Sequence, residues 1–159
     1  MANSHPEHPG QEMKGAYRGL FIEVAIDFVI MYLVMYTMIA TPDHFRLNLN
    51  NVYMTLMMVA PMGLVMLLFM RSMFPSRRAN LLIGAGAAAV FAVSLWGMRT
   101  QAAIGDDEFL RSMIPHHSGA ILMCREARLT DPEIIRLCDG IVRSQQREID
   151  QMEAILARR

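Results

Sequence analysis

The sequence lacks a surplus of charge of either sign. Its 159 residues hold 15 lysines and arginines against 15 aspartates and glutamates, so the net charge is zero with histidine neutral. Nucleic-acid-binding domains usually carry a basic excess that attracts phosphate, and this chain has none. We therefore expect no nucleic acid among its partners.

Cysteine and the short motifs of common enzymes are also scarce. The two cysteines, Cys124 and Cys138, allow one bridge or a thiol site but no disulfide-dense scaffold. The sequence contains no H-E-x-x-H, no G-x-S-x-G and no phosphate-binding glycine loop. We therefore expect a protein that is not an enzyme.

The charged residues that are present are distributed unevenly. Of the 30 acidic and basic side chains, 19 lie in residues 99–159, whereas residues 28–45 hold only Asp43. The composition is 53% hydrophobic, which gives the chain enough apolar surface to exclude intrinsic disorder. This segregation predicts a membrane-embedded part joined to a water-exposed part.

Three stretches are long and apolar enough to cross a bilayer, which requires about 20 residues per helix. They cover residues of about 17–40, 51–70 and 81–98, and polar or basic connectors with Pro42 and Pro75 separate them. No segment shows the alternation of a strand. The predicted fold is all-α, with three transmembrane helices followed by a soluble helical hairpin.

Basic residues next to the spans set the expected orientation, because cytoplasmic loops are enriched in lysine and arginine. One side carries Lys14, Arg18, Arg71, Arg77 and Arg78, and the other only Arg46 and Arg99. We therefore expect a polar cytoplasmic tail (1–16), a membrane domain (17–98) and a periplasmic domain (99–159) in a bacterial inner membrane. His5 and His8 in the tail could bind a metal weakly, but a solvated tail explains them better.

Two carboxylates lie inside the first span. Glu23 and Asp27 are four residues apart, and Met31, Met35 and Met38 continue the same stripe at about 100° per residue. Intramembrane charges often mark ion paths. The simpler alternative, which we favour, is a carboxylate near the headgroups, a hydrogen-bonded Asp27 and methionines that only pack.

Residues 106–156 have the pattern of two helices joined by a short turn. The first runs from Asp106 or Asp107 to about Leu129, and Thr130 with Glu133 has the pattern of a capping box before the second. If the chain folds back about Asp131, Cys124 lies opposite Cys138. The pair then forms a disulfide, two free thiols or a soft-metal pair, and spacing alone leaves these alternatives open.

Soft donor atoms gather in the first of these helices. Met113, His116, His117 and Met123 fall within eleven residues, and Met152 approaches from the second helix. Imidazole and thioether together favour soft or borderline ions, and thioether favours Cu(I). The alternative is that these residues are satisfied core histidines and packing methionines, since adjacent histidines point about 100° apart on a helix.

The run MIPHHSGAILM, followed by DPEI and SQQREIDQM, resembles the domain-of-unknown-function 305 family over about residues 106–156. That resemblance implies a ferritin-like helical protein, often periplasmic or membrane-anchored, with some copper-binding members linked to copper tolerance. It strengthens a copper site at Met113, His116, His117, Met123 and Met152, with Gln145 and Glu148 orienting the imidazoles.

Three positions qualify the resemblance. The chain has Leu122 where the family often has an acidic residue, and Cys124 and Cys138 where it usually has small ones. Both cysteines are partners in the register about Asp131, which supports their contact. The sequence has no E-x-x-H, so the resemblance implies no ferritin-type di-iron site.

A hairpin of about 50 residues is too small for a secure core of its own. We expect a homo-oligomer in which a second copy completes a four-helix bundle, or else docking on the membrane surface. The expected function is a membrane-anchored periplasmic copper-binding protein for sequestration, delivery or tolerance. The alternative is a non-metal scaffold or assembly subunit with a helical interaction domain.

Overall fold

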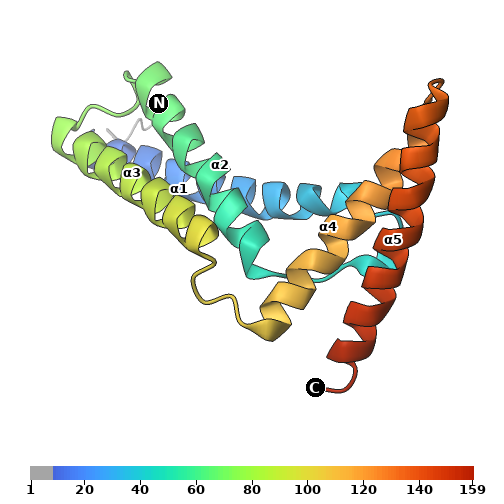
Figure 1. The fold of residues 1–159 in the computed structure, drawn as a ribbon. Helices are drawn as coiled ribbons and strands as arrows, with labels where there is room; N and C mark the ends of the chain where they lie inside the picture. The colour runs from blue at the N-terminus through green and yellow to red at the C-terminus, as the bar shows by residue number, and fades with distance from the viewer. Residues whose placement is uncertain (1–8) are drawn as a thin grey trace, which may run out of the picture. The chain divides into compact units, whose positions relative to one another are not determined.

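The computed structural model describes the backbone of residues 9–159 and the side chains of residues 15–159. The predicted tail with His5 and His8 therefore begins outside the described residues. Every regular element within them is helical, which confirms the all-α prediction for this part of the chain (Figure 1). The elements are α1 (Pro9–Val34), η1 (Met35–Met38), η2 (Pro42–His44), α2 (Leu49–Phe69), α3 (Arg77–Thr100), α4 (Asp106–Glu126) and α5 (Pro132–Leu156).

Three helical segments are long and apolar enough to cross a membrane, as the sequence predicts. They are Gly15–Met38, Leu49–Phe69 and Arg77–Thr100. The first changes from α to 3-10 geometry after Val34. In 3-10 geometry residues three apart lie on the same face, so Met38 stays in line with Met35. The interpretation of this stripe as methionines that only pack stays a prediction.

The described residues form two compact units. The first contains α1 up to Met31 together with Tyr53–Thr100, and the second contains Tyr32–Val52 together with Gln101–Arg159. The connector between the first two apolar segments thus groups with the C-terminal hairpin. In a chain that crosses a membrane three times, the connector after the first span and the segment after the third span lie on the same side. The grouping of the connector with the hairpin agrees with three spans.

The first unit has a small buried cluster near one end of its helices. Leu20 of α1, Leu67 of α2 and Phe74 of the α2–α3 turn are almost fully buried there. Farther along, Gly97 of α3 lies against the ring of Tyr53, where an added Cβ would approach Cζ to 2.9 Å. Glycine at this position therefore permits the close approach of α2 and α3.

The second unit is built on the α4–α5 hairpin (Figure 1). Its core consists of aliphatic and thioether side chains from both helices: Leu110, Ile114, Ile121, Ile149 and Met152. The cap of α5 differs from the predicted one, because the carboxylate of Asp131, and not the hydroxyl of Thr130, accepts a hydrogen bond from the N–H of Glu133 at 2.7 Å. Pro132 then occupies the first helical position, where its missing N–H costs nothing.

The connector of residues 35–48, which we call the strap, packs on α4. The N–H of Ala40 donates to Oγ of Ser118 at 2.7 Å, and Ala40 also joins the hairpin core. Arg46 pairs with Glu153 of α5 at 3.0 Å. The strap therefore covers part of the apolar surface that the hairpin alone would expose.

Candidate metal centre

α4 carries four of the five predicted metal ligands, but it turns them to different sides. His117 is buried, Met113 is half-buried, and His116 and Met123 are exposed. The helix continues through Pro115 without interruption, so these differences follow from helical spacing. α5 covers one side of α4 and the strap another, which leaves His116 and Met123 on the open side.

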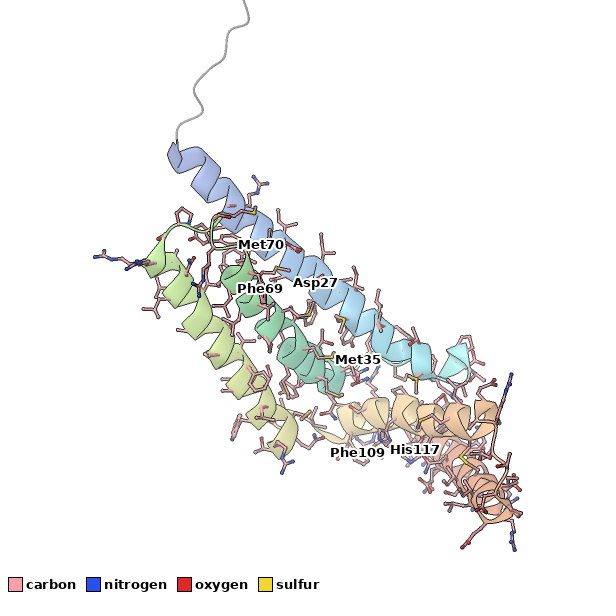
Figure 2. All side chains as sticks on the ribbon, turned by 90° about the horizontal axis from the view of Figure 1, so that it is seen from above. Asp27, Met35, Phe69, Met70, Phe109 and His117 are labelled. Atoms are coloured by element: carbon pink, nitrogen blue, oxygen red, sulfur yellow. A yellow bond between two sulfur atoms is a disulfide. The ribbon has the colours of Figure 1, made fainter. Side chains whose placement is uncertain are left out.

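His117 lies on α4 (Figure 2), and both of its ring nitrogens are within hydrogen-bond distance of an oxygen. Nδ1 lies 2.9 Å from the carbonyl oxygen of Met113, and Nε2 lies 2.7 Å from Oε2 of Glu148. A carbonyl oxygen can only accept, so Nδ1 donates to Met113, and Nε2 is held against the carboxylate of Glu148. In this arrangement, both nitrogens of His117 already have a partner within the chain.

His116 has a different environment. Its ring is exposed, and its centroid lies 5.9 Å from that of His117. Within the described part of the chain, its nitrogens make no hydrogen bond. His116 therefore offers an unengaged imidazole one helical turn from the thioether of Met113.

The three methionines differ in burial and in their position along the helices. Met152 is buried in the hairpin core, and Met113 packs against that core. Met123 is 56% exposed and lies seven residues beyond His116, a rise of about 10 Å along the helix. Helical spacing thus keeps Met113 within one turn of both histidines and leaves Met123 farther along the helix.

The two side chains expected to orient the imidazoles also differ. Glu148 contacts His117 directly, and Oγ of Ser144 lies 3.4 Å from its other carboxylate oxygen. Gln145 is half-buried and makes no hydrogen bond to either imidazole among the described residues. The same residues contain no cluster of three or more His, Cys, Asp or Glu able to hold a metal.

Cys124 and Cys138 are joined by a disulfide that links α4 to α5 near the turn. Their Cα atoms are 5.3 Å apart. A sulfur in a disulfide is not a thiolate, so the oxidised pair supplies no soft-metal ligand. The bond instead fixes the hairpin register that brings Glu148 to His117.

At the opposite end of the hairpin, Arg159 binds the first turn of α4. Its guanidinium lies 2.6 Å from Asp106 and 3.0 Å from Asp107. The hydrogen bonds to Asp106 and then to Asp107 raise the pKa of Arg159 above its usual value. These groups are well exposed, so the pair adds little to stability.

His44 is a buried residue that our sequence analysis did not single out. Its Nδ1 lies 2.8 Å from Oγ of Ser118, the same oxygen that accepts from Ala40. One feature of the sequence could have indicated His44. It lies in the connector after the first span, and this connector lies on the same side of the membrane as the hairpin after the third span. His44 and Ala40 of the strap therefore both contact α4 through Ser118.

The hairpin region is similar to a known protein family. A family described as a domain of unknown function (DUF305) matches residues 93–156, which include all of α4 and α5. An uncharacterized protein of Acanthamoeba polyphaga mimivirus is 36% identical over 143 residues, which cover 88% of this chain and 92% of that protein. No solved structure matches the chain. The viral similarity therefore extends well beyond the hairpin into the apolar helices.

Proposed function

This chain belongs to the domain-of-unknown-function 305 family, and from that premise we propose that it is a membrane-anchored protein that captures copper as Cu(I). Its role would be sequestration, delivery or tolerance, with copper as cargo and no catalysis. The three apolar helices would anchor it in a bacterial inner membrane. The arginines near one membrane edge favour a cytoplasmic N-terminus and a periplasmic hairpin.

The observation that carries this proposal is the exposed, unengaged imidazole of His116 one turn from the thioether of Met113. An exposed ring can meet an incoming ion without breaking an existing contact. Nitrogen and sulfur donors together select soft or borderline ions over Mg²⁺ and Ca²⁺. We therefore take His116 and Met113 as the first ligands.

His117 would join them by exchanging its carboxylate partner. Glu148 is half exposed, with a side chain 51% accessible, so it can turn to solvent at small cost. Nδ1 would keep its hydrogen bond to the Met113 carbonyl and hold the ring in place. Nε2 would then face the ion in place of the carboxylate, and like other histidine ligands it binds as neutral imidazole.

Two or three donor atoms from one helix would leave part of the ion's coordination sphere unfilled. Met123 is too far along α4 to join Met113 in one chain, but it is exposed enough to reach a neighbouring copy. A homo-oligomer that pairs two hairpins into a four-helix bundle would bring further thioethers to the ion. Met152 would remain a core residue that supports the interface of α4 and α5.

The test is Cu(I) binding by the full chain in detergent, measured by competition with a coloured Cu(I) chelator. We expect His116→Ala and Met113→Leu each to weaken binding at least about tenfold, and the pair His116→Ala/His117→Ala to abolish it. Met62→Leu in α2 removes a thioether elsewhere and should leave affinity unchanged. If the double histidine variant binds as tightly as the parent, this site is wrong.

A second candidate is a scaffold that binds no metal. Its support is the exposed apolar tip of the hairpin, where Ile134, Ile135 and Leu137 are 46%, 40% and 61% accessible, together with the satisfied ring of His117. Such a tip suits contact with another protein. In that case the double histidine variant would lower Tm equally with and without copper, whereas a copper protein would lose its copper-dependent gain in Tm.

A further inference from the structure

The end of the first unit where α2 turns into α3 is strongly basic. Arg71, Arg77 and Arg78 lie there, and the sequence contains no acidic residue between Asp43 and Asp106. The three arginines are exposed, and among residues with described side chains none of them forms an ion pair. The nearest described carboxylate along α1 is Glu23, which makes no ion pair with them either. Among the described side chains, this surface therefore has cationic groups without anionic partners.

A cavity of about 740 Å³ opens beside two of these arginines. Its volume falls in the range of about 300–1,000 Å³ that is typical of ligand sites. Arg71, Arg77 and Asn80 form its polar end, and apolar side chains of α2 and α3 line the rest. The lining continues to Gly84, seven residues or about 10 Å beyond Arg77 along α3.

The polar end of the cavity is held in place by contacts within the first unit. The hydroxyl of Tyr17 donates to Oδ1 of Asn80 at 2.7 Å, and Nδ2 of Asn80 donates to the carbonyl of Phe74 at 2.8 Å. Phe74 is 5% exposed and its ring packs on Tyr17 at 5.2 Å. Figure 2 shows this region with Phe69 and Met70 labelled at the end of α2. The turn that presents the arginines is therefore anchored.

We propose that this cavity binds the headgroup of an anionic phospholipid. The guanidinium groups would hold the phosphate, and Asn80 would add a polar contact. The apolar wall along α2 and α3 would take the first part of an acyl chain. That wall favours a lipid over free phosphate, which needs no apolar surface. The position of Arg71 and Arg77 at the ends of two apolar segments is the level at which headgroups lie.

The test measures lipid binding to the full chain in detergent by native mass spectrometry, with phosphatidylglycerol compared with phosphatidylcholine. The parent should prefer phosphatidylglycerol. Arg71→Gln/Arg77→Gln should reduce this preference by roughly tenfold or more, since each basic residue near an anionic membrane contributes about fivefold. Arg18→Gln/Arg78→Gln removes the same charge outside the cavity and should retain the preference.

A second variant keeps every charge. Gly84→Leu should fill the apolar part of the cavity and weaken phosphatidylglycerol binding, whereas Gly86→Leu, which lies outside it, should not. The two glycine variants test lipid binding in the cavity even if the arginine variants fail to fold. Equal loss in both arginine pairs, unchanged binding in Gly84→Leu, or displacement of the lipid by millimolar inorganic phosphate would overturn the proposal.

Discussion

Ser118 is the residue at which the strap and the hairpin meet. It is fully buried, and its Oγ contacts the N–H of Ala40 and Nδ1 of His44 at once. Buried polar groups that lose their partners are costly, because water cannot replace the missing hydrogen bond. A single oxygen therefore satisfies one backbone group and one imidazole.

We predict that Ser118→Ala lowers the free energy of unfolding of the second unit by about 1–3 kcal/mol, since it leaves two polar groups without their partner. Ser112→Ala is the matched control, because its hydroxyl donates only to the carbonyl of Glu108 one turn back. Hydrogen exchange of α4 amides in the full chain would measure both. Equal losses in the two variants would contradict the role assigned to Ser118.

The sequence did not predict which of the two adjacent histidines is buried. Helical spacing indicated that His116 and His117 point about 100° apart, but it did not indicate which one faces inward. The pattern of α4 alone was insufficient because the helix is covered on two sides, by α5 and by the strap. His44 was missed for the same reason, since its partner lies 74 residues away in the sequence.

At the scale of helices, type and approximate extent followed from the sequence. The segment predicted at 51–70 is α2 at Leu49–Phe69, within two residues at each end. The helix predicted at 106–129 ends instead at Glu126, because Ala127 takes an extended backbone. The register about Asp131 placed Cys124 opposite Cys138, and the structure joins them. Residues typical of turns made these helix ends recognisable in the sequence. No such residue marks the change from α to 3-10 geometry after Val34.

Packing of α2 on α3 depends on Gly97, and we predict that Gly97→Ala destabilises the first unit by about 1–3 kcal/mol, the usual cost of overpacking. The added Cβ would lie 2.9 Å from Cζ of Tyr53, so the ring must move. Gly86→Ala in the same helix has no heavy atom within 4 Å of its Cβ and is the control. The measurement is Tm in detergent, and a drop in Tm for Gly86→Ala as large as that for Gly97→Ala would refute this explanation.

At the scale of the whole molecule, the hairpin is supported by the chain that precedes it. The sequence indicated that two helices of this length need a further packing surface, and it suggested a second copy or the membrane. The structure supplies some of that surface from the strap, through Ala40 in the core and the Arg46–Glu153 pair. A second copy stays a prediction, directed now at the side of α4 that the strap leaves open.

This dependence predicts that the isolated hairpin, residues 101–159, is less stable than the same residues in the full chain. Without the strap, Ser118 has no Ala40 or His44 to satisfy, so Ser118→Ala should change the Tm of the isolated hairpin little. The same substitution in the full chain should cost about 1–3 kcal/mol. Circular dichroism of the isolated hairpin and hydrogen exchange of the full chain provide the comparison. An equal cost in both contexts would mean that Ser118 acts within the hairpin and that the strap contributes nothing through it.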